Sequence, residues 1–117
     1  MPGFKTSEKI KFPREAVFNY VADTKNSTSW LPGVVATEML TAGPMRVGAR
    51  YLETRQAAEL TGDTEIEVKE FDPPRRFATG FDKRGYRTTY TYTFLEQGSG
   101  TKVELECEVD AEGWRIP

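Results

Sequence analysis

Hydrophobic and polar residues alternate along most of this chain, and the alternation predicts a protein built largely from β-strands. The first such segment runs from Phe4 to Phe12 and places Phe4, Ile10 and Phe12 on one face. The same two-residue period returns in residues 34–42, 49–59, 63–71, 75–82, 86–96 and 101–110. Short segments rich in glycine, proline and aspartate separate them, at 43–48, 60–63, 72–74, 83–85 and 97–100. The pattern therefore predicts an antiparallel meander of about seven strands.

The last two predicted strands indicate a sheet with one solvated face and one covered face. Four residues of the final strand share a face that alternates with charged positions: Val103, Leu105, Cys107 and Val109. The preceding strand carries a matching row of Tyr86, Thr88, Tyr90, Tyr92 and Phe94. We therefore expect the covered face of the sheet to be rich in aromatic side chains.

Residues 13–22 are the clearest exception to the strand pattern. Proline at the start of a helix is tolerated, and Val17, Phe18, Val21 and Ala22 recur at helical spacing. The sequence thus predicts an amphipathic helix about 15 Å long, which is too short to cover seven strands. Asp23 can end this helix and cap another short one.

The polar run TKNSTS ends at Trp30 and Leu31, before Pro32 and Gly33 turn the chain into the next strand. We expect the run itself to stay in solvent while Trp30 and Leu31 close a short second helix onto one end of the sheet. Trp30 then has two compatible interpretations. It fills the core, which is the favoured one, and it also forms the wall of a ligand cavity.

Composition restricts the chemistry that this chain can perform. The 117 residues form one predicted domain, 1–117, with a net charge of −2 and a pI near 5.3, which argues against a nucleic-acid surface. There is no histidine and only one cysteine, so imidazole bases and the usual zinc sites are excluded. No cofactor or metal is predicted, and Cys107 is expected to be a buried, inert thiol. Any catalysis must use carboxylates, tyrosines, lysines or arginines.

The same composition predicts where the chain resides. No window of about 18 apolar residues exists, so no membrane span is expected. The N-terminal segment lacks the pattern of a signal peptide, and a single cysteine fits a reducing compartment. We therefore expect a cytoplasmic protein.

The segment ARYLETR contains the most interesting polar residues. If Tyr51 faces inward, the two-residue period also turns Glu53 and Arg55 inward, where they could orient a polar ligand group or act as an acid–base pair. If Leu52 faces inward, the two charged residues form a solvated surface pair. The sequence does not settle this register, and we favour the solvated one.

Other charged residues are expected on the surface. Glu65 and Glu67 share a face, but Ile66 and Val68 claim the core side of that strand. The arginines of DKRGYR and PPRRF lie in predicted turns, where they could border a pocket but are more commonly solvent-exposed.

Several segments in order resemble the START-like (SRPBCC) superfamily, in particular its polyketide cyclase/dehydrase and lipid-transport type. They are FPREAVFNYVADTKNSTSWLPGVVATEML, GPMRVGARY, EVKEFDPPRRF and YTYTFLEQGSGTKVELECEV. The resemblance implies an α+β helix-grip fold, in which a curved antiparallel sheet follows two short helices and wraps around a long C-terminal helix. The sequence departs from this pattern because it ends where that helix would begin.

The resemblance also implies an apolar cavity for a small hydrophobic ligand such as a lipid, a polyketide or an aromatic compound. The residues predicted to line it are Trp30, Leu31, Met39, Tyr51, Phe81, Tyr90 and Tyr92. The catalytic residues are unknown, with Glu53, Arg55 and Tyr90 as candidates if the protein is instead a polyketide cyclase/dehydrase-like enzyme. A third hypothesis is a protein-interaction module that uses the open sheet face.

The early end of the chain leads to a prediction about assembly. Without a covering helix, Tyr92, Phe94, Val103 and Leu105 would leave an apolar patch larger than a soluble monomer normally exposes. We therefore expect either a homodimer that covers this sheet face or a chain that is shortened relative to its parent.

Overall fold

The computed structural model describes residues 3–111, and its main feature is a curved antiparallel sheet of seven strands. The strand order is β1-β7-β6-β5-β4-β3-β2, so β1 and β2 form the two edges. The strands are β1 (Gly3–Ile10), β2 (Val34–Met39), β3 (Arg50–Ala57), β4 (Leu60–Asp72), β5 (Arg76–Lys83), β6 (Tyr86–Gln97) and β7 (Gly100–Ala111). The predicted meander is confirmed.

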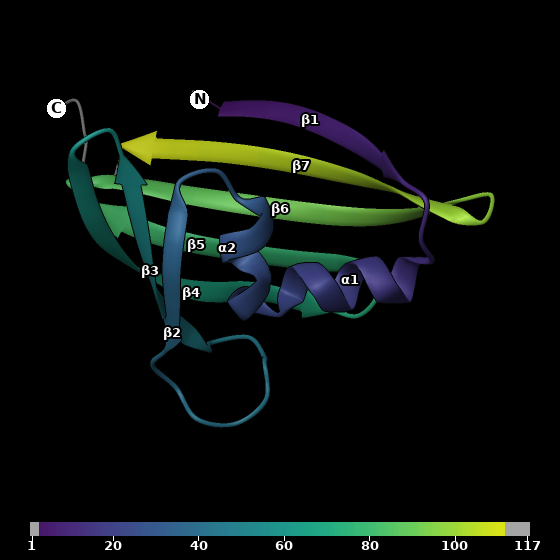
Figure 1. The fold of residues 1–117 in the computed structure, drawn as a ribbon, viewed down its shortest axis with the longest axis horizontal. Coiled ribbons are helices and arrows are strands. Elements are labelled where there is room, and N and C mark those ends of the chain that lie inside the picture. Colours follow the sequence, from purple (N-terminus) through teal and green to yellow (C-terminus); the bar gives the residue numbers. More distant parts are fainter. Residues whose placement is uncertain (1–2, 112–117) are drawn as a thin grey trace, which may run out of the picture.

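Three short helical segments join β1 to β2 and lie against one face of the sheet (Figure 1). They are α1 (Arg14–Ala22), the 3-10 turn η1 (Thr24–Asn26) and α2 (Ser27–Trp30). Helix α1 contacts β5, β6 and β7, and α2 contacts β2. The predicted helix at 13–22 and the short second helix are both confirmed. Within residues 3–111, no helix follows β7.

Helix α1 docks on the sheet through a cluster of aromatic rings. Phe18 is 1% exposed, and its ring lies 5.2 Å from that of Phe94, 5.7 Å from that of Phe71 and 6.3 Å from that of Phe77. These tilted and edge-to-face arrangements are the ones that aromatic pairs favour. The predicted amphipathic helix is therefore confirmed, because its apolar side packs α1 onto the middle of the sheet.

The turn between β3 and β4 is shorter than predicted and lies earlier in the chain. The sequence indicated a turn over residues 60–63, but Leu60 pairs with Ala57 and Gly62 pairs with Arg55. The reversal occurs at Ala58 and Glu59, with Ala58 at a positive φ of 55°. Gly62 misled the prediction because glycine usually marks a turn, whereas here it lies within a long strand beside Lys83.

The aromatic face of β6 is confirmed, but the ends of β1 differ from the prediction. Tyr92 and Phe94 are buried, whereas Tyr86, at the start of the strand, is 54% exposed and lies beyond the covered part of the predicted row. By contrast, Phe4 is 53% exposed and Phe12, which lies beyond the end of β1, is 63% exposed. Strand β1 is an edge strand, and the neighbouring helix α1 does not extend over it (Figure 1).

None of the helices within residues 3–111 is long and apolar enough to span a membrane.

Candidate ligand-binding site

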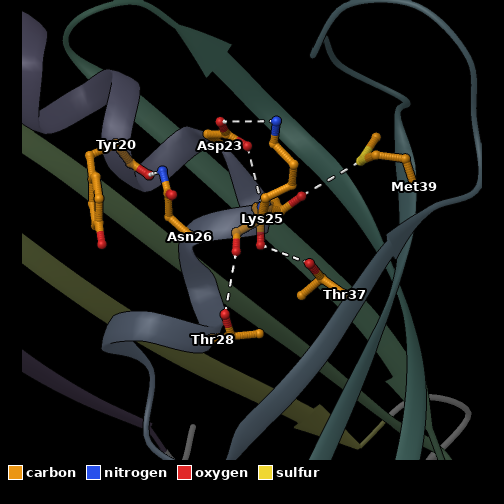
Figure 2. A network of polar contacts seen from close by, with 8 residues as sticks. Tyr20, Asp23, Lys25, Asn26, Thr28, Thr37 and Met39 are labelled. Atoms are coloured by element: carbon orange, nitrogen blue, oxygen red, sulfur yellow. Dashed lines mark hydrogen bonds and ion pairs between the residues drawn. The ribbon is translucent and has the colours of Figure 1, made fainter.

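The polar run after α1 is held in place by a network of short-range hydrogen bonds (Figure 2). Asp23 ends α1 and accepts a bond from the backbone N–H of Lys25 at 3.3 Å, so it acts as both stop and cap, as predicted. The Asn26 amide donates to the carbonyl of Tyr20 at 3.1 Å. These contacts fold the run back along the end of α1.

Two further bonds tie this run to the sheet. The hydroxyl of Thr37 on β2 donates to the carbonyl of Thr24 at 3.0 Å, and the Thr24 hydroxyl lies 3.6 Å from the sulfur of Met39 (Figure 2). Thr24 and Ser27 are each only 4% exposed. The expectation that the whole run stays in solvent was therefore wrong. The run alternates between solvent and the sheet because its two small hydroxyl residues fit against the sheet.

Trp30, the last residue of α2, packs edge-to-face on Tyr92 with ring centroids 5.9 Å apart. Tyr92 in turn stacks on Phe77 at 6.3 Å. The indole Nε1 is buried and has no hydrogen-bond partner within residues 3–111. Trp30 thus packs against the core, as favoured, but with an unsatisfied polar atom.

The register of β3 turns Tyr51 and Glu53 toward the helices. Tyr51 and Glu53 are each 4% exposed, and Ala49, on the same face, is fully buried. The solvated register, which we favoured from sequence, is wrong. The large ring of Tyr51 and the small side chain of Ala49 suit the crowded inner face, where they join the core with Ile66 and Val68.

Glu53 and Arg55 form an ion pair at the end of this inner row. The guanidinium Nε of Arg55 donates to Oε2 of Glu53 at 2.9 Å. The Glu53 side chain is 6% exposed, whereas that of Arg55 is 47% exposed. Partial burial works to lower the pKa of Arg55, but the hydrogen bond and negative charge of Glu53 outweigh it and raise that pKa overall. Arg55 therefore stays charged and compensates the buried carboxylate.

A pocket of about 190 Å³ lies where this ion pair meets the helical segments, and we call it the tyrosine pocket. Val21, Thr24, Ser27, Trp30 and Leu31 form its helical wall, and Tyr51, Glu53, Arg55, Thr79, Tyr90 and Tyr92 form the polar part of its sheet wall. Phe4, Ile66, Phe77 and Leu105 complete it. The pocket combines apolar surface with phenols and a single ion pair, which is the composition expected of a small-molecule site.

Burial keeps the phenols of this pocket in their neutral form. Desolvation, followed by the negative charge of Glu53, raises the pKa of Tyr51 well above its ordinary value. Desolvation also raises the pKa of Tyr92 strongly and that of Tyr90 more moderately. At neutral pH all three hydroxyls are protonated, as an ordinary phenol is, and can donate and accept hydrogen bonds; Tyr51 already contacts Thr79, and Tyr90 contacts Cys107.

Cys107 is paired with Tyr90 in the register of β6 and β7 but is outside the pocket lining. It is 5% exposed, and desolvation raises the pKa of its thiol, although the Tyr90 hydroxyl lies close enough to act in the opposite direction. The thiol is therefore protonated at neutral pH, in agreement with the prediction of a buried, inert cysteine.

The tyrosine pocket brings together five of the seven residues predicted to bind ligand. Trp30, Leu31, Tyr51, Tyr90 and Tyr92 line it, as do all three catalytic candidates, Glu53, Arg55 and Tyr90. Met39 and Phe81 are outside it. Met39 is 38% exposed beside Thr24, and Phe81 packs on the ring of Tyr90 at 6.3 Å.

Sequence reasoning also missed several lining residues. Phe77, Thr79 and Phe81 are two residues apart along β5 and therefore share one face of the strand. The two-residue period that indicated Phe81 could have indicated Phe77 and Thr79 as well. Thr24 and Ser27 carried no such signal, because they lie within an unbroken polar run.

A second, more open cavity of about 610 Å³ adjoins the pocket and is almost entirely apolar; we call it the α1 groove. One side is formed by β1, with Thr6, Ser7, Glu8 and Ile10, and the other by α1, with Ala16, Val17, Tyr20 and Val21. Phe12, Trp30, Tyr92, Val103 and Leu105 complete the lining. Val21, Trp30, Tyr92 and Leu105 border both cavities, so the two are neighbours separated by these side chains.

The remaining charged candidates lie on the outer surface, as expected. Glu65 pairs with Arg50 at 2.9 Å, and Glu67 pairs with Lys69 at 3.2 Å. Arg75, in the segment PPRRF, makes two bonds to the carboxylate of Asp72 at 2.8 and 3.0 Å. These pairs are solvent-exposed and lie outside the pocket lining.

Comparison with known families decides the classification of this fold. A family model described as polyketide cyclase/dehydrase and lipid transport matches residues 1–116. The chain belongs to this family. The predicted START-like resemblance and helix-grip fold class are therefore confirmed. No curated protein matches the chain.

Solved structures similar to this member of the polyketide cyclase/dehydrase and lipid transport family agree on the fold. TTHA0849 from Thermus thermophilus is 23% identical with a TM-score of 0.78, and the match covers 99% of this chain and 77% of that one. Ara h 8.0201 is 12% identical with a TM-score of 0.77, with 99% and 82% covered. The di-domain ARO/CYC BexL from the BE-7585A biosynthetic pathway is 20% identical with a TM-score of 0.74, with 92% and 35% covered.

Proposed function

We propose that this protein binds a small hydrophobic ligand in the tyrosine pocket, over the concave face of the sheet. The observation that carries the proposal is the pocket itself, where an apolar wall faces three neutral phenols and a compensated ion pair. Membership of the polyketide cyclase/dehydrase and lipid transport family supports the same class of ligand.

A thermal-shift panel of aromatic and acyl compounds tests this proposal. A ligand present at a hundred times its dissociation constant adds about 2.7 kcal/mol of stability, which gives a clear increase in the melting temperature. Leu31→Trp, which narrows the pocket, should remove most of the shift. Val35→Trp is the matched control, since Val35 is 51% exposed and outside the pocket lining. Indifference of the wild-type protein to the whole panel would contradict the proposal.

A second candidate is a polyketide cyclase/dehydrase-like reaction, favoured by the burial of Glu53 inside the pocket. Its Oε2 atom is engaged by Arg55, and its carboxylate faces the same space as Tyr90 and Tyr92. In that role Glu53 would accept a proton from an acidic carbon of a bound polyketone, while Arg55 and Tyr90 donate hydrogen bonds to the oxygen that becomes negative.

Glu53→Gln distinguishes the binding function from the catalytic one. If the carboxylate is the base, the substitution should lower turnover of a polyketone substrate by a factor of about 100 or more, the usual contribution of general-base catalysis, with ligand binding retained. Unchanged turnover would remove Glu53 from the mechanism.

Two sequence-based hypotheses about assembly remain as predictions: a homodimer that covers the sheet face, and a protein-interaction module that uses this face. The predicted uncovered patch was wrong in part, because Tyr92 and Phe94 are 7% and 0% exposed beneath the helical segments. The surface that a partner would cover is instead the α1 groove, with Phe12 at its rim 63% exposed. Light scattering coupled to size-exclusion chromatography measures the assembly state, and a stable monomer would contradict the homodimer. A cytoplasmic location likewise remains a prediction.

A further inference from the structure

The tyrosine pocket and the α1 groove lie side by side but differ in chemistry. The pocket holds Glu53, Arg55 and the tyrosine hydroxyls, whereas the groove is lined by aliphatic and aromatic carbon from α1, β1 and β7. A molecule that occupied both cavities would meet polar groups at one end and apolar surface along the rest of its length. This contrast limits which ligands can fit, if the proposed binding function holds.

The hydrogen-bonding groups in the pocket restrict the head of such a ligand further. Among the described residues 3–111, Arg55 uses only its Nε to bond Oε2 of Glu53, which leaves its two terminal nitrogens as donors and the second Glu53 oxygen as an acceptor. A hydroxyl group can satisfy both, because it donates one hydrogen bond and accepts others. A carboxylate can only accept, and it would add a second negative charge beside Glu53.

The boundary between the two cavities is formed largely by two aromatic rings. Trp30 and Tyr92 pack edge-to-face at 5.9 Å and border both cavities, and the Trp30 N–H is buried without a partner among the described residues. An unsatisfied buried donor is unfavourable, so the indole gains little from its present position through this atom. A ligand that occupies both cavities must pass these side chains, so Trp30 is a residue whose surroundings it would change.

We propose that the tyrosine pocket and the α1 groove form one continuous binding site for an elongated ligand with an uncharged hydroxyl head and an apolar tail. The hydroxyl lies against Glu53 and Arg55, and the tail passes Trp30 into the groove between α1 and β1. Long-chain alcohols and alkylphenols have this chemistry, whereas fatty acids carry the disfavoured charge. This proposal rests on the proposed function and specifies its ligand class.

A matched series of synthetic probes tests the head group by calorimetric titration at pH 7. The probes are 4-heptylphenol, 4-heptylanisole, which lacks the hydroxyl hydrogen, and 4-heptylbenzoate, which is charged. We expect 4-heptylphenol to bind about tenfold more tightly than either of the others, the factor that one net hydrogen bond gives. Equal affinity for the phenol and the anisole, or tighter binding of the benzoate, would overturn the proposal.

The Glu53→Gln variant provides a sharper test of the same point. Removing the negative charge leaves Arg55 uncompensated, so the preference should shift toward 4-heptylbenzoate by about fivefold or more. An unchanged preference would show that the head group is not read by this ion pair and would overturn that part of the proposal.

A chain-length comparison tests the tail and does not depend on Glu53. 4-Heptylphenol should bind at least tenfold more tightly than p-cresol, which is too short to reach the groove. Ala16→Phe, an exposed helix position in the groove, should remove this advantage. Asn19→Phe is the matched control, because Asn19 is exposed on α1 outside the groove lining. Equal affinity for the two phenols would overturn the proposal.

Tryptophan fluorescence reports whether ligand binding changes the surroundings of Trp30. Trp114→Phe leaves Trp30 as the only tryptophan, and its emission should change more when 4-heptylphenol binds than when p-cresol binds, because only the heptyl tail passes the indole ring into the groove. If Ala16→Phe instead breaks a dimer and leaves both affinities unchanged, a second copy occupies the groove and the proposal fails. If other hydrophobic compounds bind but no alkylphenol does, this proposal fails and the proposed function stands; if nothing binds, both fail.

Discussion

At the scale of single residues, the buried phenols are the most unusual feature of this protein. Tyr51 and Tyr92 line a pocket in which the charged groups of the described residues are one ion pair, Glu53 and Arg55. Desolvation raises the pKa of both phenols, so the folded state holds their protons more tightly than the unfolded state does. Their contribution to stability is complete below about pH 10, the value for an unfolded tyrosine, and is lost as the pH rises toward their folded pKa values.

A spectrophotometric titration measures this directly. At about pH 11, at least two of the five tyrosines should remain protonated in the folded protein and should ionise when urea unfolds it. Tyr51→Phe and Tyr92→Phe should each reduce the number of protected phenols by one. Ionisation of all five at that pH, with the circular dichroism spectrum of the fold intact, would contradict the assignment.

Individual site residues could be predicted from the sequence only where the alternation of a strand showed which side chains face inward. Tyr90 and Tyr92 followed from the alternating row of β6, but Glu53 and Arg55 depended on a register that the sequence left open. The inward register is marked by Ala49, whose small side chain is fully buried on the same face as Tyr51 and Glu53. The burial of Thr24 could not be predicted, because it depends on contacts with β2 made far along the chain.

At the scale of elements, helix α1 is the part that determines the shape of the site. Its apolar stripe docks through Phe18, while its flank, with Ala16 and Tyr20, faces the α1 groove. The sequence predicted this helix well because the stripe and the N-terminal proline agree. It predicted the β3–β4 turn poorly because Gly62 lies inside a strand, paired with Arg55, and does not reverse the chain.

Removing the ring that docks α1 should destabilise the protein strongly. Phe18→Ala deletes a side chain that is 1% exposed and contacts three other rings, so we expect a loss of about 3–5 kcal/mol in the free energy of unfolding. Urea denaturation measures the change. Asn19→Ala, at the next and exposed position, is the control and should alter stability by about 0.5 kcal/mol or less. A loss below about 1 kcal/mol for Phe18→Ala would mean that α1 is not held by this cluster.

At the scale of the whole molecule, a seven-stranded sheet supports two adjoining cavities on the face where the short helices lie (Figure 1). Solved structures as little as 12% identical share this fold, so the fold alone does not determine the ligand. What limits the ligand is the distribution of polar groups over the two cavities. The tyrosine pocket therefore carries the functional conclusion.

The measurement that tests this conclusion most directly is a crystal structure of the protein grown with 4-heptylphenol. We expect electron density for the ring of the compound beside Tyr90, Tyr92 and Trp30, with its hydroxyl within hydrogen-bonding distance of Glu53. Two results would contradict this conclusion. One is a tyrosine pocket that stays empty in the crystals while the protein also fails to bind every compound of the thermal-shift panel. The other is a pocket filled by side chains of a second copy.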